Sequence, residues 1–260
     1  MTVVIAIVNQ KGGVGKTTTT VNLSTSLALN GRRVLTIDLD PQGNCSSAFG
    51  VDKEELEAHA YHLLLGQASL AEVRVETEIE GLQLIPTNTH LAGAEVELVT
   101  ELGREGRLAE GINDHLEEYD YILIDCPPSL GLITLNALTA ADRIIVPLQC
   151  EYFALEGVTQ LLKTLDLVKA RINPRLSLEG VLLTMFDRRN KLTFSVQEEV
   201  NSFFGSLVYE TLIPRNVRLS ESPSFGKPIA LYDHRAQGAK AYEALALEVI
   251  ERIEGQQVTP

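Results

Sequence analysis

A short glycine-rich segment of this 260-residue chain has the residue types needed to hold a phosphate group. Gly12, Gly13 and Gly15 precede Lys16 and Thr17. Glycine has no Cβ atom, so such a loop can curl and point successive N–H groups at an anion. Lys16 can then reach the β- and γ-phosphates of a nucleotide, and the Thr17 hydroxyl can bind Mg²⁺. The predicted phosphate loop comprises Gly12, Gly13, Val14, Gly15, Lys16, Thr17 and Thr18.

The segments on either side of this loop are suited to position it. Residues 3–8 are an unbroken apolar run, which is typical of a strand buried on both faces. Residues 19–30 carry apolar side chains at helical spacing and end at Gly31, a residue type that commonly terminates helices. A strand, a glycine loop and a helix in this order place an anion at the positive end of the helix dipole.

The loop departs from the usual pattern G-x-x-x-x-G-K-[ST] in two places. Gln10 stands where the first glycine is expected, and a second lysine, Lys11, precedes the glycines. A second cation at a phosphate site is unfavourable unless an anion offsets it. A plain glycine-rich turn with a solvated lysine is the alternative interpretation. A dinucleotide-binding G-x-G-x-x-G pattern is excluded because its third glycine is missing.

Two further strands are predicted to end in carboxylates at the same edge of the sheet. Residues 119–125 form an apolar strand ending at Asp125, the sequence form of a Walker B element whose aspartate holds Mg²⁺ through a water. Residues 33–38 form another and lead into Asp38 and Asp40. In open α/β sheets ligands bind outside the carboxyl ends of strands, so these groups should face the phosphates. Asp38 could equally cap the loop backbone, whereas Asp40 is the candidate for orienting the attacking water.

Composition indicates a globular protein of the cytoplasm. Hydrophobic residues make up 45% of the chain, and no apolar run is long enough for a membrane span. Three widely spaced cysteines suggest a reducing compartment and offer no zinc site. The net charge is −13, but residues 51–120 hold 17 acidic and 4 basic side chains, whereas residues 181–240 hold 8 basic and 6 acidic ones. The acidic total therefore does not exclude a local basic face.

The rest of the chain alternates strands and helices. The predicted strands cover residues 82–86, 143–148, 178–185 and 207–213, and the predicted helices cover residues 54–65, 92–102, 107–118, 152–170, 194–204 and 239–254. This alternation predicts one α/β domain over residues 1–260, P-loop NTPase-like, with a mostly parallel twisted sheet and helices on both faces. Anionic lipid would repel the acidic outer face of the last helix, so we expect that helix to pack on the fold and not to bind a membrane.

The loops after two late strands bear on the choice of nucleotide. Asn190-Lys191 matches the start of a guanine-reading Asn-Lys-x-Asp sequence, but Thr193 stands where the aspartate is required, so adenine is favoured over guanine. Residues 214–216, Pro-Arg-Asn, are predicted to form a rigid turn whose backbone and amide could read a base edge. A plain strand-to-helix connector is the alternative for that turn.

Together these motifs resemble one family. Residues 11–18 look like the deviant Walker A motif of the ParA/MinD group of P-loop ATPases. The fuller resemblance is to ParA/Soj-type chromosome or plasmid partition ATPases, and it covers nearly the whole chain. It rests on residues 38–44 (Asp-Leu-Asp-Pro-Gln-Gly-Asn), residues 124–129 (Ile-Asp-Cys-Pro-Pro-Ser) and, most specifically, residues 213–228 (IPRNVRLSESPSFGKP).

The resemblance implies a set of catalytic roles for the phosphate site. It implies that ATP drives a sandwich dimer in which Lys11 reaches the nucleotide of the partner subunit, which would supply the anion that this lysine needs. It also implies a Mg²⁺-dependent ATPase in which Lys16 and Asp40 act in hydrolysis. Thr17 and Asp125 match the residues that serve the metal in this family.

The resemblance also implies what the protein binds. Pro214 and Asn216 match positions that lie at the adenine, and Arg189 and Arg218 match basic residues with which the ATP-bound homodimer holds double-stranded DNA without sequence preference. A ParB-type centromere-binding partner would stimulate hydrolysis and release the dimer. The expectation is a cytoplasmic, nucleoid-associated partition protein that does not bind membranes.

Two alternatives belong to other functional classes. A membrane-cycling division-site ATPase like MinD requires a basic amphipathic C-terminal helix, which the acidic tail does not provide. A metal-cluster ATPase like the nitrogenase iron protein requires paired cysteines across a dimer, and Cys45, Cys126 and Cys150 do not match that placement.

Overall fold

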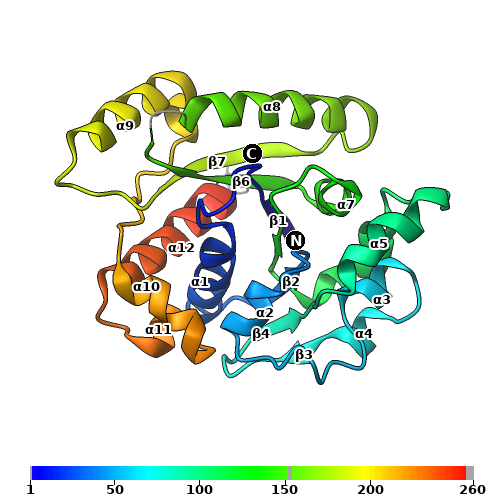
Figure 1. The fold of residues 1–260 in the computed structure, drawn as a ribbon. Helices are drawn as coiled ribbons and strands as arrows, with labels where there is room; N and C mark the ends of the chain where they lie inside the picture. Colours follow the sequence, from blue (N-terminus) through cyan, green and yellow to red (C-terminus); the bar gives the residue numbers. More distant parts are fainter. Residues whose placement is uncertain (1, 152–153, 256–260) are drawn as a thin grey trace.

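A single twisted sheet forms the centre of the computed structural model, which describes residues 2–151 and 154–255 (Figure 1). The sheet has seven strands in the order β3-β4-β2-β5-β1-β6-β7. All neighbouring strands pair in parallel except the short edge strand β3, which is antiparallel to β4. The strands are β1 (Val3–Ile7), β2 (Val34–Asp38), β3 (Val75–Glu76), β4 (Leu82–Ile85), β5 (Tyr121–Asp125), β6 (Arg143–Gln149) and β7 (Ser177–Thr184). The predicted mostly parallel α/β sheet is thus confirmed.

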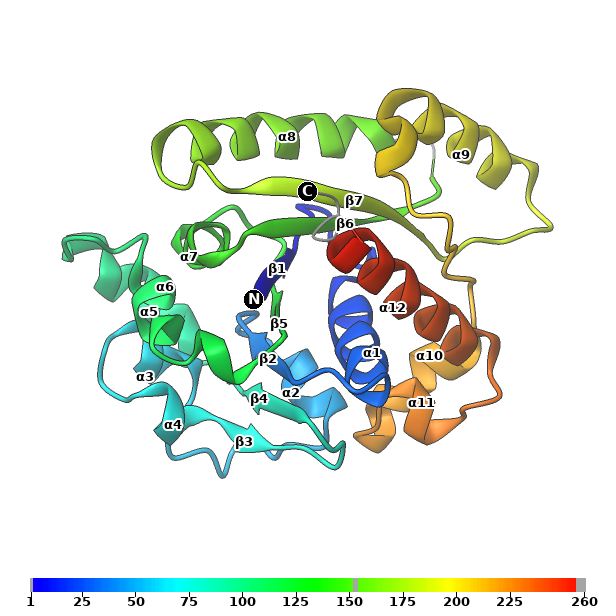
Figure 2. The same ribbon diagram turned by 180° about the vertical axis from the view of Figure 1, so that it is seen from behind.

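Helices cover both faces of this sheet, as Figures 1 and 2 show from opposite sides. The α-helices are α1 (Lys16–Leu29), α2 (Asn44–Ala48), α3 (Ala60–Leu64), α4 (Leu70–Val73), α5 (Leu91–Glu97), α6 (Arg107–Asn113), α7 (Leu132–Ala140), α8 (Ala154–Arg171), α9 (Lys191–Phe204), α10 (Val217–Glu221), α11 (Ile229–Tyr232) and α12 (Gln237–Gly255). Four short 3₁₀ turns are described as well: η1 (Leu98–Thr100), η2 (Leu116–Glu118), η3 (Gly205–Leu207) and η4 (Ser222–Phe225).

Strand β1 shows why helices must cover both faces of the sheet. Its side chains alternate between the two faces, as they must in any strand. Val4 and Ala6 enter one apolar core with α3 and α5 to α9, whereas Ile5 and Ile7 enter the other core with α1 and α12. All five residues of β1 are buried. An apolar run without polar alternation therefore specifies a central strand between two helical layers.

The last helix packs on the fold, as expected from its sequence. Tyr242, Leu245 and Val249 of α12 are buried against α1, and Arg32 forms an ion pair with Glu254 near the end of the helix. Within residues 2–151 and 154–255, no helix is both long and apolar enough to cross a membrane.

The strand predicted over residues 207–213 is wrong. This segment makes only single bridges to the edge of the sheet, at Val208 and Pro214. The amides of Glu210 and Thr211 donate instead to the carboxylate of Glu248 on α12, at 2.8 and 3.0 Å. Tyr209 and Ile213 still donate to carbonyls of β7, so the segment follows the edge of the sheet without forming a regular strand.

The predicted helices of the acidic segment are shorter than expected. Residues 54–59 are irregular and α3 begins only at residue 60, where the amide of His59 donates to Nδ1 of His62 at 3.3 Å. The helix predicted over residues 92–102 ends as the 3₁₀ turn η1, and that over residues 107–118 divides into α6 and η2. The first two residues of the helix predicted over 152–170 lie outside the described residues, and the remainder is α8.

Candidate nucleotide and metal site

The loop between β1 and α1 has the backbone conformation that a phosphate loop needs. Gly13 and Gly15 have φ angles of 74° and 93°, in the left-handed region that side chains with a Cβ atom rarely adopt. The carbonyl of Val14 accepts a hydrogen bond of 2.8 Å from the hydroxyl of Thr184, which ties the loop to the end of β7. The loop is therefore held in a fixed curl at the carboxyl edge of the sheet.

Lys16 begins α1 and is directed back into this loop. It is only 7% exposed, and its Nζ donates to the carbonyl of Lys11 at 3.2 Å. Burial lowers the pKa of Lys16, while the nearby carboxylates of Asp125 and Asp40 oppose that change. A desolvated ammonium inside a loop of N–H groups is a strong binding group for a phosphate.

Thr17 and Asp125 meet at the predicted metal position. The Thr17 hydroxyl donates to Asp125 Oδ2 at 2.7 Å, and the Thr20 hydroxyl donates to Oδ1 at 3.1 Å. Asp125 is fully buried, and Mg²⁺ favours such hard oxygen ligands together with several waters and substrate phosphates. The donor set therefore fits Mg²⁺ held jointly with a nucleotide. No group of three His, Cys, Asp or Glu side chains within the described part of the chain could hold a metal by itself.

Asp38 lies directly beside Asp125, because these residues pair in the register of β2 and β5. It accepts hydrogen bonds from the amide and the hydroxyl of Ser46, at 2.8 and 2.7 Å, and from the amide of Asp40 at 3.2 Å. Burial raises the pKa of both Asp38 and Asp125, and for Asp125 the charge of Asp38 adds to the rise. Asp38 therefore caps the backbone of the loop that follows β2, which is the role suggested for it from the sequence.

Asp40 lies at the mouth of the site, on the turn that leaves β2. Its carboxylate accepts from the amide of Gln42 at 3.0 Å, and its carbonyl accepts from Gly43 at 2.8 Å. The turn is thus closed on itself, and the carboxylate is close enough to Lys16 to oppose the fall of that lysine's pKa. This places Asp40 in reach of the phosphate loop, as its sequence position predicts.

Lys11 has a counterion within this single chain. Its Nζ forms an ion pair with the carboxylate of Glu151, which follows β6, and both side chains are about half exposed. The anion that a second cation requires is therefore supplied within the chain. The expected contact of Lys11 with a partner's nucleotide stays a prediction.

The turn predicted to read a base forms one wall of a cavity of about 380 Å³ beside the phosphate loop. Gly15 and Thr18 line the inner end of this cavity, and Pro214, Asn216 and Tyr242 line its walls. The side-chain oxygen Oδ1 of Asn216 caps α10 by accepting a hydrogen bond of 3.3 Å from the backbone amide of Leu219. Its NH₂ group remains as the donor that could face the acceptor nitrogens of a base.

The two arginines predicted to hold DNA belong to one edge of the molecule. Arg189 precedes α9 and Arg218 lies on α10, and both views show these elements on the same side (Figures 1 and 2). Arg189 pairs with Asp187 at 3.0 Å, and Arg218 pairs with Glu221 at 3.0 Å. Each arginine thus has an acidic neighbour that DNA phosphates would have to replace.

Some residues of the site were not predicted from the sequence. Thr20 follows Lys16 by one helical turn, a spacing that could have indicated its contact with Asp125. Ser46 holds Asp38, Thr184 holds the loop and Glu151 holds Lys11. The contacts of Thr184 and Glu151 join distant parts of the chain, so no local spacing reveals them.

Comparisons with known proteins identify relatives over almost the whole chain. A family described as an AAA domain matches residues 2–178. The chain is 54% identical over 246 residues to the sporulation initiation inhibitor protein Soj of Bacillus subtilis, with 95% of this chain and 97% of Soj covered. It is 52% identical over 255 residues to the chromosome partitioning protein ParA of Caulobacter vibrioides, with 96% and 94% covered.

A solved structure shares the fold as well. Cobyrinic acid a,c-diamide synthase of Mycobacterium smegmatis, crystallised with ADP and magnesium, superposes with a TM-score of 0.87 at 38% identity. The comparison covers 100% of this chain and 98% of that one. Because its identity to Soj and ParA exceeds 50% over almost the full length of each, this chain belongs to the Soj/ParA family of chromosome-partitioning proteins.

Proposed function

We propose that this protein is an ATP-driven DNA-partitioning ATPase whose nucleotide state decides whether it is a monomer or a DNA-binding dimer. The observation that carries the proposal is the convergence of Lys16, Thr17 and Asp125 beneath a glycine loop with positive φ angles. Soj and ParA relatives support the partition role, and a related structure holds ADP and magnesium.

ATP and Mg²⁺ are the proposed cofactors. The amides of residues 12–16 and the Lys16 ammonium would bind the β- and γ-phosphates, and the cavity lined by Pro214 and Asn216 would take the adenosine. Thr17 and Asp125 would hold Mg²⁺, which when bound neutralises charge on the β- and γ-phosphates. The Asp125 carboxylate is then no longer an uncompensated buried charge beside Asp38.

Hydrolysis would proceed by in-line attack of water on the γ-phosphorus. The new bond joins the water oxygen to phosphorus, the bond to the bridging oxygen breaks, and ADP and inorganic phosphate form. Asp40 would orient the water from its turn at the mouth of the site. Lys16 and, from the partner subunit, Lys11 would stabilise the charge on the transferring group.

Lys11 is the proposed link between ATP and dimer formation. Its ion pair with Glu151 is half exposed, and such pairs contribute only about 0–1 kcal/mol. A triphosphate on a facing subunit is a much stronger counterion than one solvated carboxylate. The lysine can therefore exchange Glu151 for the partner's nucleotide at small cost.

The dimer would bind double-stranded DNA through its phosphates. Arg189 and Arg218 are exposed on one edge, and a two-fold dimer doubles their number. A ParB-type partner would then stimulate hydrolysis and release the dimer in the cytoplasm, at the nucleoid. A synthase activity is less favoured, because the structure with that name is less similar to this chain than Soj and ParA are.

Light scattering of the protein with Mg²⁺ and each nucleotide tests this proposal. With ATP we expect the mass to double from 28.5 kDa, whereas with ADP it should stay at that value. The change should be accompanied by ATP turnover that increases with DNA and a ParB-type partner. A mass that is the same with ATP and ADP would reject the nucleotide-controlled dimer.

A further inference from the structure

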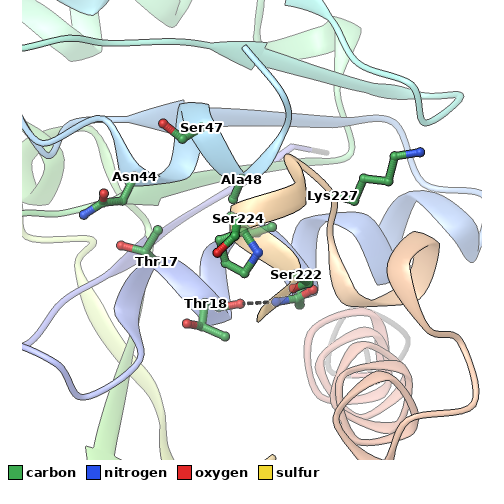
Figure 3. Close-up of a pocket in the computed structure, with 11 residues that line it drawn as sticks. Thr17, Thr18, Asn44, Ser47, Ala48, Ser222, Ser224 and Lys227 are labelled. Carbon is green, nitrogen blue, oxygen red and sulfur yellow. Dashed lines mark hydrogen bonds between the residues drawn. The ribbon is translucent and has the colours of Figure 1, made fainter. Parts of the chain in front are cut away.

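A second cavity opens on the other side of Thr18 from the base cavity. It has a volume of about 420 Å³ and lies between α1, α2 and the turn η4. Figure 3 shows Thr17 and Asn44 at one end of this cavity and Lys227 at the other, with Ser47 and Ser224 between them. It thus runs from the metal position toward the outside of the molecule.

The inner end of the cavity lies beside the proposed metal position. Thr17 is the residue whose hydroxyl contacts Asp125, so it marks the metal position. Asn44 begins α2, directly after the turn that carries Asp40. The cavity therefore begins next to Thr17, which in the proposed function holds the Mg²⁺ that neutralises the β- and γ-phosphates.

Most of the side chains that line the cavity are polar or cationic, as a passage for a diffusing anion requires. The lining includes hydroxyls of Ser47, Ser222 and Ser224, the Asn44 amide and the Lys227 ammonium, and none of its lining residues is acidic. Lys227 is exposed and has only a loose ion pair with Glu78 at 3.7 Å, so it can attract that anion at the outer end.

The walls of the cavity are fixed, so it is not a chance gap between loops. A Cβ atom at Gly226 would lie 2.8 Å from the Cα of Gly50, which shows that the chain after η4 touches the chain after α2 directly. On the third side, Asn22 of α1 accepts from the amide of Ile229 and donates to the carbonyl of Thr18, both at 2.8 Å.

We propose that this cavity is the exit path for inorganic phosphate after ATP hydrolysis. The inference rests on the proposed function, in which a partner subunit covers the mouth of the phosphate loop where Lys11 lies. With that mouth closed, phosphate leaves sideways, past Ser47 and Ser224 to Lys227, while the dimer is still intact. Phosphate release and dimer opening are then separate steps.

Two variants close or reverse this path without touching the phosphate loop. Ser224→Phe places a ring in the passage from an exposed position on η4, and Lys227→Glu puts a negative charge at its outer end. Their matched controls are Ser202→Phe on α9 and Lys240→Glu on α12, which change exposed side chains elsewhere. Rapid quenching measures phosphate formation on the protein, and a fluorescent phosphate-binding protein measures its release, both after mixing with Mg²⁺–ATP.

We expect both variants to form phosphate at the rate of the unaltered protein but to release it at least about tenfold more slowly. The two controls should show no such delay. Release that keeps pace with formation in both variants would overturn the exit path, as would a variant in which both steps slow equally. Absence of phosphate formation in the unaltered protein would instead reject the proposed ATPase, so the two failures are distinguishable.

Discussion

Replacing Asp125 by asparagine should stabilise the nucleotide-free protein while removing its response to magnesium. Asp125 and Asp38 are both fully buried and face each other on neighbouring strands. Such strands lie about 4.8 Å apart, so two charges there repel by about 3 kcal/mol at an effective dielectric constant of about 20. Asparagine keeps the shape of the side chain and removes this repulsion.

Weaker contacts of the asparagine offset part of the stability gained by removing this repulsion. Thr17 and Thr20 donate to the Asp125 carboxylate, and a hydrogen bond to a neutral acceptor is weaker by about 1 kcal/mol. The buried Lys16 also loses the favourable charge of Asp125. We therefore expect a net gain of about 1 kcal/mol, which raises the melting temperature by about 3 °C for a domain of this size.

The raised pKa of Asp125 also predicts how the stability of the protein changes with pH. Because the pKa of Asp125 is raised in the folded state, the folded protein keeps a proton that the unfolded chain releases above about pH 4. Stability of the unaltered protein should fall as the pH rises from 5 to 8, and Asp125→Asn should reduce that fall. The gain should be larger at pH 8 than at pH 5.

Thermal unfolding at both pH values, with and without Mg²⁺–ATP, measures these effects. A ligand at one hundred times its dissociation constant stabilises by about 2.7 kcal/mol, and Asp125→Asn should lose most of the Mg²⁺-dependent part. Asp114→Asn, which changes an exposed carboxylate, is the control. An Asp125→Asn protein that is less stable than the unaltered one at pH 8 would refute the repulsion between the two carboxylates.

Four further substitutions test other parts of the account. Lys11→Ala should prevent the ATP-dependent doubling of mass in light scattering while some nucleotide affinity remains, and a normal dimer would exclude the role of Lys11 across the interface. Asp40→Ala should trap the dimer on DNA because hydrolysis stops, so normal phosphate production would remove Asp40 from catalysis. Arg218→Glu should lower DNA retention in a gel-shift assay at least about tenfold with dimerisation intact, and unchanged retention would contradict its DNA contact. Glu248→Ala leaves the amides of Glu210 and Thr211 without their acceptor. It should lower the free energy of unfolding, measured by urea titration, by about 2 kcal/mol. A decrease below about 0.5 kcal/mol would show that water replaces the carboxylate as acceptor.

The sequence was sufficient to predict the parts of the site that depend on local spacing. Gly13, Gly15, Lys16 and Thr17 follow one another between a strand and a helix, so their geometry is set within a few residues. Asp125 was predictable because a buried parallel strand must end at the same edge as β1.

The parts that could not be predicted depend on contacts between distant segments. In place of the regular strand expected over residues 207–213, the amides of Glu210 and Thr211 donate to Glu248, far along the chain. Glu151 could not be identified as the partner of Lys11, since 140 residues separate them. In the acidic segment the helix expected from residue 54 begins only at Ala60, where the amide of His59 donates to His62.

Nucleotide control of DNA binding can be measured by titrating double-stranded DNA with ATP, with ADP and without nucleotide, across a salt series. We expect tight binding only when ATP is present. Two arginines from each subunit should then give a slope of about −3.6 for the logarithm of the affinity against the logarithm of the salt concentration. Equal DNA binding in all three nucleotide states would contradict the claim that nucleotide controls the DNA-binding dimer.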